Sequence, residues 1–385
     1  MSTWTRSTSM GLLFIVLAMG RAAGADLADA LDTLRAVGPE GAGNEAATVA
    51  WQQAAQVDVS RVPQLLAGLK GANPLAANWI RTAVDAVCER TLRNGGTLPK
   101  QAFEQFVLNT DQDPRARRLA YEWLLKVDPA AEGRIVPQLL DDPSVELRRD
   151  AVARLIEQGE KAVAAKQTDE AAKLLQQAFD AARDRDQIGT IVKLLKDLGR
   201  EVDLVTHDGL IVDWQVIGPF DNTDEAGFNK VYPPETAFDA SAEYQGKHGK
   251  VAWLKYRSED PAGKVDLYKA LEETLTRISE KLQERDVVAY AVSDFHSPSE
   301  KTVQIRSSTM NAIKTWVNGV LVDEHNVYHA GSQFDQYQAD AVIRRGSNRI
   351  MVKLCQNAQT QSWTETFAFQ LRVCDAIGSG IVSAE

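Results

Sequence analysis

The spacing of hydrophobic residues changes once along the chain, between residues 202 and 209. Before this point apolar residues recur at steps of three and four, which is typical of helices with one buried face. Beyond it apolar and polar residues alternate, which is typical of strands with one buried face. The pattern therefore predicts a multidomain protein in which an all-α half is followed by an all-β half.

Short sequence patterns recur in the predicted helical half. Arg81–Val87 matches Arg118–Leu124 and Arg149–Leu155, and Val62–Leu66 matches Val136–Leu140. One helix pair cannot bury its apolar face alone, so repeated pairs are expected to stack and cover one another. Within each copy the small alanine lets helices approach closely. The arginine is expected to cap a helix or to bridge between units.

These copies resemble HEAT repeats in a short and irregular form, and residues 158–199 look more like a tetratricopeptide-type helix pair. An irregular helical bundle is the alternative. Solenoids built from such repeats present extended concave faces. The resemblance therefore implies a surface for a protein partner within residues 26–203.

The alternating half predicts an antiparallel sandwich or barrel of short strands. The expected strands cover residues 212–216, 287–295, 302–308, 312–317, 320–323, 339–344, 348–356 and 365–373. Asn318-Gly319 predicts a two-residue hairpin, because a type I′ turn needs positive φ at both positions. Gly218-Pro219 is expected to break the first strand. Helical spacing from Leu267 to Leu282 predicts one amphipathic helix inserted between strands.

The first residues have the layout of a secretory signal peptide. Arg6 precedes a short apolar run, Gly11–Met19, and Ala23–Ala25 has the form of a cleavage site. The run is too short for a bilayer core, which takes about 20 residues. A buried N-terminal helix is the alternative. We expect residues 1–25 to be removed and the chain to be exported, to the periplasm or outside the cell, with no membrane span.

The net charge argues against one class of partner. A net charge of −10 over 385 residues, with no basic stripe, disfavours a nucleic-acid partner, because phosphate backbones repel such a chain.

Cys88 looks like a small core residue. If the last two strands form a simple hairpin, Cys355 and Cys374 lie roughly 26 Å apart at the rise of a strand, too far for a disulfide. A disulfide between the two cysteines would require a different strand arrangement, such as facing sheets.

Two runs in the second half carry a family resemblance. They are Ile313–Gly319 and Arg345–Lys353, with Trp214–Phe220, Tyr232–Glu235 and Tyr328–Tyr337 in support. Together they resemble galactose-binding-like jelly-roll modules, among them the sugar-binding domains attached to β-galactosidase-type glycoside hydrolases, and exported bacterial proteins that carry such modules. The resemblance implies a jelly-roll domain over residues 204–378, followed by a tail at 379–385. It leaves the ligand open, because a fold does not decide a function.

Three aromatic residues at or near predicted loops are the candidate ligand-binding residues. They are Tyr328, Tyr337 and Trp363. Aromatic rings stack on the apolar faces of sugars while polar neighbours bond the hydroxyl groups. The sequence therefore predicts a glycan site on these loops.

Asp221, Asn222 and Asp224 crowd one turn after the first strand. Oxygen-rich loops hold Ca²⁺, and the family resemblance implies a structural Ca²⁺, since many galactose-binding-like modules carry one. The alternative is a solvated turn, because Asp and Asn favour turns in any case. No other cofactor is expected.

Catalytic motifs are missing from the sequence. It has no nucleophile elbow, no phosphate-cradling loop and no dinucleotide fingerprint, so we expect a chain that is not an enzyme. The preferred interpretation is an exported binding protein that recognises a polysaccharide or glycoprotein through its sandwich and a protein partner through its helical repeats. A scaffolding module for protein–protein interaction is one alternative, and a glycan-active hydrolase with an unrecognised site is the other.

Overall fold

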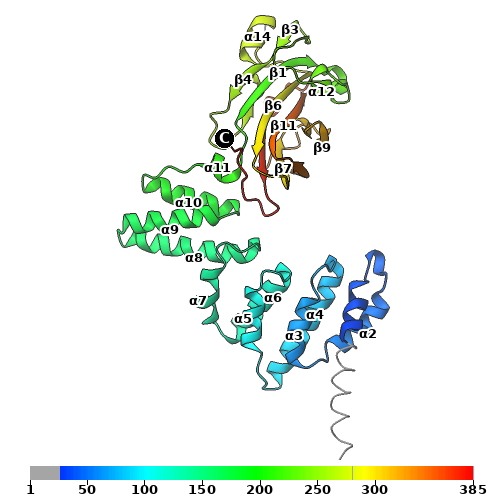
Figure 1. Cartoon of the computed structure of the whole chain (residues 1–385), viewed down its shortest axis with the longest axis vertical. Helices are drawn as coiled ribbons and strands as arrows, with labels where there is room; N and C mark the ends of the chain where they lie inside the picture. The colour runs from blue at the N-terminus through cyan, green and yellow to red at the C-terminus, as the bar shows by residue number, and fades with distance from the viewer. Residues whose placement is uncertain (1–26, 280, 385) are drawn as a thin grey trace, which may run out of the picture. The chain divides into compact units, whose positions relative to one another are not determined.

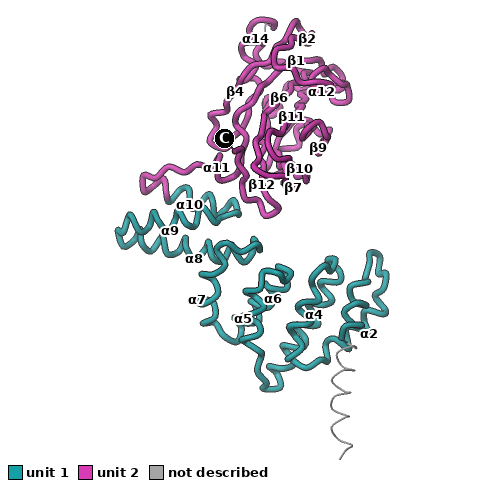
Figure 2. Tube along the Cα trace, in the orientation of Figure 1, with its two compact units in different colours: residues 1–194 teal, residues 195–385 magenta. Residues whose placement is uncertain are grey.

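The computed structural model describes residues 27–279 and 281–384, in two compact units that cover residues 1–194 and 195–385 (Figures 1 and 2). The predicted signal peptide, residues 1–25, lies outside the described residues. The first unit is helical and the second is built mainly from antiparallel strands. The predicted change from helix to strand is therefore confirmed, whereas the domain bounds at residues 203 and 204 stay a prediction.

The helical part begins with a helix over residues 27–35 and continues as paired helices. They are α2 (Asn44–Ala54), α3 (Val62–Ala67), α4 (Pro74–Arg93), α5 (Lys100–Leu108), α6 (Pro114–Val127), α7 (Ala131–Ile135), α8 (Val145–Ala164), α9 (Thr168–Ala181) and α10 (Arg185–Asp197). Asn73, Asp113 and Ser144 cap α4, α6 and α8, since each side chain accepts a hydrogen bond from a backbone N–H of the first turn. Local sequence thus decides where these helices begin. No helix among the described residues has both the length and the apolar character needed to cross a bilayer.

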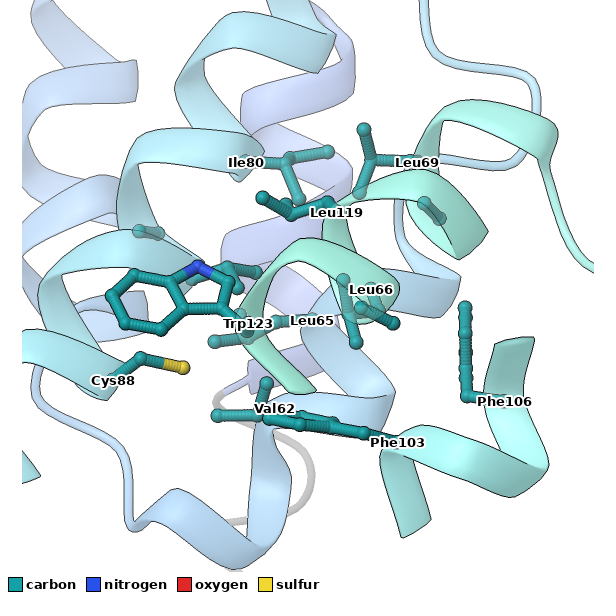
Figure 3. Close-up of a cluster of buried hydrophobic side chains, with 14 of the residues drawn as sticks. Val62, Leu65, Leu66, Leu69, Ile80, Cys88, Phe103, Phe106, Leu119 and Trp123 are labelled. Carbon is teal, nitrogen blue, oxygen red and sulfur yellow. The ribbon is translucent and has the colours of Figure 1, made fainter. Parts of the chain in front are cut away.

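Buried apolar side chains of α3, α4, α5 and α6 form one core (Figure 3). Leu65 and Leu66 of α3, Ile80 of α4 and Phe103 of α5 are completely buried. The indole N–H of Trp123 in this core donates to Asp85 Oδ1 at 2.8 Å. The helices therefore bury their apolar faces against one another, as the periodicity predicts, while the assignment to HEAT repeats stays a prediction.

The three repeated arginines connect successive helix pairs. The N–O distances are 3.8 Å for Arg81–Glu122, 2.5 Å for Arg118–Asp150 and 2.5 Å for Arg149–Asp186. These contacts join α4 to α6, α6 to α8 and α8 to α10. Arg118 and Arg149 thus bridge to the next pair through hydrogen bonds, which is one of the two roles expected from the sequence, whereas Arg81 makes only a long ion pair to it.

One ion pair of the helical unit is buried. The side chains of Arg117 and Asp142 are 0% and 3% exposed. Arg117 Nη1 and Nη2 donate to Asp142 Oδ1 and Oδ2 at 2.8 and 2.5 Å, and Arg117 Nε donates to the carbonyl of Val107 at 2.6 Å. Asp142 Oδ1 also accepts from the backbone N–H of Ser144. The pair ties α6 to the turn before α8 with its polar atoms satisfied.

Within its described residues, the second unit contains the short helix α11 (Leu204–Asp208) and twelve strands. The strands are β1 (Asp213–Asp221), β2 (Glu243–Gln245), β3 (Lys250–Ala252), β4 (Leu254–Arg257), β5 (Val265–Asp266), β6 (Val287–Ser297), β7 (Lys301–Thr309), β8 (Ala312–Val317), β9 (Val320–His325), β10 (Tyr337–Ile343), β11 (Gly346–Gln356) and β12 (Ala368–Cys374). One sheet has the order β4-β1-β6-β11-β8-β9, another has the order β10-β7-β12-β5, and β2 and β3 form a small hairpin.

The two larger sheets enclose one shared core. It takes Val216, Ala291 and Val352 from the six-stranded sheet and Ile305 and Leu371 from the four-stranded sheet. The rings of Trp214 and Phe369 meet across it edge to face, with centroids 5.1 Å apart. An antiparallel sandwich is therefore observed, and its assignment to the galactose-binding-like jelly rolls stays a prediction.

A second apolar cluster lies on the outer face of the six-stranded sheet, beneath residues 222–253. This segment contains η4 (Thr223–Phe228) and α12 (Pro233–Thr236). Lys353 of β11 is completely buried there, and its Nζ donates to the carbonyls of Phe228 and Lys230 and to Glu235 Oε1, the last at 2.8 Å. The buried lysine therefore fastens the segment to the sheet.

Two local predictions are wrong and one is confirmed. β1 continues through Gly218-Pro219, because a register shift between Ile217 and Phe220 accommodates the missing proline N–H. The predicted helix from Leu267 to Leu282 is two short helices, α13 (Leu267–Ala270) and α14 (Glu272–Ile278), since Leu271 leaves the helical region at φ −103° and ψ 9°. The Asn318-Gly319 hairpin is confirmed, with φ of 53° and 81°.

All three cysteines are free. β11 and β12 lie in different sheets, so of the two arrangements left open by the sequence the structure has the facing sheets and not the hairpin. The inward side chains are Leu354 in β11 and Val373 in β12. Neighbouring residues of a strand point to opposite faces, so Cys355 and Cys374 lie on the outer faces of two facing sheets, with the core between them.

Candidate functional site

Three loops of the sandwich meet at one place. They follow β1, β9 and β11 and contribute Asn222, Glu225, Tyr328, His329, Asn357 and Trp363. We call these six residues the loop rim. Its members connect residues that are more than a hundred positions apart in the chain.

Side-chain hydrogen bonds hold the loop rim together. Asn222 Nδ2 donates to Tyr328 Oη at 3.2 Å and to the carbonyl of Gln356 at 2.9 Å. Asn357 Nδ2 donates to Glu225 Oε1 at 3.1 Å, and Asn357 Oδ1 lies 2.9 Å from His329 Nε2. Asn222 and Asn357 thus act as the two links between the loops.

The backbone of this region is strained. Asp224, Glu225 and His329 have φ of 55°, 60° and 59°, and Asp286, before β6, has φ of 52°. Such left-handed values are uncommon for residues other than glycine and persist only where the surroundings enforce them. Asp286 belongs to the same network, because its carbonyl accepts from the backbone N–H of Asn222 and its N–H donates to the carbonyl of Asn357. Strain of this kind gathers at functional sites.

Two buried polar atoms of the loop rim have no hydrogen-bond partner among the described residues. They are Asn222 Oδ1 and His329 Nδ1. Leaving a buried polar atom unpaired costs about 1–3 kcal/mol, so such atoms are rare and call for an explanation. A ligand that supplies the missing partners is one such explanation.

An exposed indole lies beside these polar atoms. Trp363 is 56% exposed, and its ring meets that of His329 edge to face, with centroids 5.6 Å apart. A large exposed apolar ring next to polar groups can lie against the face of a ring-shaped ligand while the polar groups bond its substituents. The loop rim therefore combines the two kinds of contact that a sugar requires.

Carboxyl groups surround the loop rim and influence one another. Burial raises the pKa of Asp286 above its ordinary value, and the nearby Asp221, Asp224 and Glu225 raise it further. The pKa of Asp221 is lowered instead, because hydrogen bonds from Thr223 and Lys247 outweigh its partial burial. Neighbouring carboxyls with pKa values moved in opposite directions are the arrangement that acid–base chemistry uses.

The candidate aromatic residues do not share one place. Tyr328 and Trp363 belong to the loop rim, and burial raises the pKa of Tyr328. Tyr337 begins β10 and stacks on His325 of β9, with ring centroids 3.7 Å apart. Glu225, His329 and Asn357 are the loop-rim residues that were not among the predicted site residues. A polar residue in a loop leaves no periodic pattern in the sequence. The position of His329 directly after the candidate Tyr328 is the one sequence feature that could have suggested it.

The three residues proposed for calcium have different surroundings. Asp221 accepts from Thr223 and pairs with Lys247 at 3.3 Å, Asn222 is buried against Gln356, and Asp224 is exposed. Among the described residues, no group of three His, Cys, Asp or Glu side chains is arranged to hold a metal ion. Calcium at this turn stays a prediction.

Comparisons with known proteins give matches only among solved structures. No protein-family model and no curated protein matches the chain. A β-glucosidase from Kluyveromyces marxianus is 10% identical over 76% of this chain and 35% of its own, with a TM-score of 0.26. Its complex with glucose is 11% identical over 76% and 36%, also with a TM-score of 0.26. The GH31 α-xylosidase Xac1773 from Xanthomonas citri is 10% identical over 31% and 14%, with a TM-score of 0.17.

The chain spans about a third of the length of the β-glucosidase structures. The identities and TM-scores are too low for these likenesses to assign a fold or an activity. The matched structures are glycoside hydrolases, so the prediction that the chain is not an enzyme does not stand, and its activity stays open. That prediction relied on missing motifs, and a glycosidase needs only two suitably placed carboxyl groups, which distant segments can supply.

Proposed function

We propose that the second unit binds a glycan at the loop rim. The observation that carries this proposal is the exposed Trp363 beside His329, whose Nδ1 is buried and unpaired among the described residues. The indole offers a surface for the apolar face of a sugar ring, and the imidazole nitrogen offers a partner for a hydroxyl group. Glu225 and Asn357 add acceptors and donors within the same network.

Strain and unpaired atoms support a binding role over a purely structural one. A rim that only closed the sandwich would gain stability from glycine at the left-handed positions and from full hydrogen bonding. Retaining the less stable arrangement is expected where a ligand uses it. The proposal also includes export, for which the pattern in residues 1–25 is the support, and a jelly-roll fold, for which the quoted sequence runs are the support.

Hydrolysis of a glycoside is the second candidate function. Its specific support is Asp286, a partly buried carboxyl whose pKa is raised by burial and by nearby acids that include Glu225. A protonated Asp286 would give its proton to the glycosidic oxygen, while the Glu225 carboxylate would activate water or attack the sugar carbon. Both acids would then flank the bond to be broken.

The binding proposal is tested with the chain that begins at residue 26 and a panel of polysaccharides and oligosaccharides, glucosides and xylosides included. We expect retention of at least one class, and Trp363→Ala should weaken that binding at least tenfold, which corresponds to about 1.4 kcal/mol. Tyr337→Ala is the matched control, because this aromatic residue lies outside the loop rim. Failure to bind any glycan, or equal loss in both variants, would contradict the proposal.

Hydrolysis is tested separately with p-nitrophenyl β-glucoside and α-xyloside and with any polysaccharide that binds. Asp286→Asn and Glu225→Gln should each abolish product release while the glycan still binds. Glu243→Gln changes an exposed acid of β2 and should leave the rate unaltered. If the wild-type chain releases no product from any bound glycan, hydrolysis is ruled out and binding remains.

A further inference from the structure

A groove runs across α4, α6 and α8 of the helical unit. It encloses about 540 Å³, which lies within the range of small-molecule and peptide pockets. Its lining includes Leu69, Ala77, Asn78, Arg81, Leu119 and Glu146. The groove lies entirely in the first unit, so it is independent of the loop rim.

The floor of the groove is apolar and its walls are charged. Leu69, Ala77 and Leu119 are buried beneath it. The repeated arginines stand on its walls, one each on α4, α6 and α8. A ligand in this groove therefore meets apolar surface below and, at the side, guanidinium groups together with the carboxylates of Glu122, Glu146 and Asp150.

The three repeated arginines differ in how many of their guanidinium N–H groups already bond neighbouring carboxylates. Arg149 bonds both carboxylate oxygens of Asp186, and Arg118 bonds Asp150 and Glu122. Arg81 is 58% exposed, and its closest acid, Glu122, is 3.8 Å away. Within the described part of the chain, the guanidinium of Arg81 makes no hydrogen bond, so its five N–H donors are available.

The surroundings of Arg81 favour a carboxylate at one end of an apolar ligand. Asn78 lies one helical turn before Arg81 and is exposed, so its amide can donate to the same ligand group. Glu146 lines the groove from α8 and makes no ion pair among the described residues. Its charge disfavours a uniformly acidic ligand and restricts the negative group to the α4 end.

We propose that this groove binds a peptide segment of a protein partner, with a carboxylate on Arg81 and apolar side chains over Leu69 and Leu119. Arginine holds a carboxylate through two parallel hydrogen bonds, which gives direction as well as affinity. The carboxylate comes either from an acidic side chain or from the C-terminus of the partner, and both sources present the same chemistry. The repeated arginine thus has two uses, bridging helix pairs where it is engaged and binding where it is open.

The experiment measures fluorescence anisotropy of a labelled octapeptide of alternating Leu and Ser that ends in Glu. Four forms separate the sources of the carboxylate: Glu or Gln at the last position, each with a free or an amidated C-terminus. We expect the amidated Gln peptide to bind at least tenfold more weakly than the best of the other three. Whichever single carboxylate restores binding identifies the source.

Variants of the full exported chain place the binding in the groove. Arg81→Gln should weaken the carboxylate-bearing peptides about tenfold and leave the amidated Gln peptide unchanged. Arg93→Gln is the matched control, because Arg93 is exposed on the same helix and lies outside the groove. Circular dichroism checks that both variants fold.

Three outcomes would overturn this proposal. They are the absence of binding by every form of the probe, equal binding of the amidated Gln peptide, and equal effects of the two arginine variants. Binding of a polyuronate at Arg81 in place of the peptides would assign the groove to an anionic glycan and would also overturn it. None of these results bears on Trp363, so they are distinguishable from a failure of the loop-rim proposal.

Discussion

The buried polar atoms of the Arg117–Asp142 pair and those of the loop rim differ in their hydrogen bonding. In the pair, guanidinium and carboxylate satisfy each other and also bond neighbouring backbone groups. In the loop rim, Asn222 Oδ1 and His329 Nδ1 are buried without partners among the described residues. The first arrangement stabilises the fold. The second costs stability, and we propose that it leaves polar atoms available to a ligand.

The largest expected effect is on the buried pair. Asp142→Ala leaves the Arg117 guanidinium buried without its counter-ion, and removing one partner of a buried pair costs about 3–5 kcal/mol. The free energy of unfolding, measured by urea denaturation and followed through Trp fluorescence, should fall by that amount. Asp141→Ala changes the exposed neighbour and should alter it by less than about 0.5 kcal/mol. Similar losses in both variants would mean that the pair is not a stabilising element.

The buried lysine of the sandwich tests whether full pairing matters in the second unit as well. Lys353→Met removes three hydrogen bonds and leaves Glu235 without its cation. We expect a loss of about 3 kcal/mol, at the low end for buried pairs, because Glu235 is 13% exposed and can recover some hydration. Lys255→Met, on the exposed side of β4, serves as control in the same denaturation experiment. A cost as small as that of the control would restrict the contrast to the helical unit.

Substitution in the loop rim should affect binding more than stability. His329→Gly loses one hydrogen bond to Asn357 and relieves a left-handed backbone at φ 59°. Each contribution is about 1 kcal/mol and they have opposite signs, so the free energy of unfolding should change by less than about 1 kcal/mol. Glycan affinity should fall about tenfold in the same variant. A large loss of stability with unchanged affinity would place His329 among the structural residues.

The smallest expected effect is a pH dependence from Asp286. Its pKa is raised in the folded chain by burial and by neighbouring acids, so the folded state holds this proton more tightly than the unfolded state does. The contribution to stability is present at low pH and is lost as the pH rises through the folded-state pKa. The Asp286→Asn variant should therefore gain stability relative to the wild type as the pH rises above about 4, the ordinary pKa of an aspartate. Denaturation curves across this range that run parallel for the two proteins would contradict the raised pKa.

Sequence reasoning predicted the elements better than their arrangement. Alternation along residues 348–356 and 365–373 was sufficient to predict β11 and β12, because a strand with one buried face has a period of two. The same pattern carries no information on which sheet a strand joins, so the sequence left open whether the two strands form a hairpin or lie in facing sheets. The sequence also did not predict which of the aromatic candidates lie together. Tyr328 and Trp363 meet in the loop rim, whereas Tyr337 lies against His325. The position of each loop depends on the places that its flanking strands take in the sheets.

The amino-acid sequence by itself determined the element types, the caps of α4, α6 and α8, the Asn318-Gly319 turn and the recurrence of arginine on these three helices. These depend on interactions between residues a few positions apart, which a short stretch of chain contains in full. Only the tertiary structure decided that Asn222 meets Tyr328 and Gln356, that Asp286 lies among acids, and that Arg81 is open while Arg149 is engaged. Such contacts depend on strand order and helix stacking, because they join residues far apart in the chain whose proximity follows from burying the whole apolar surface at once.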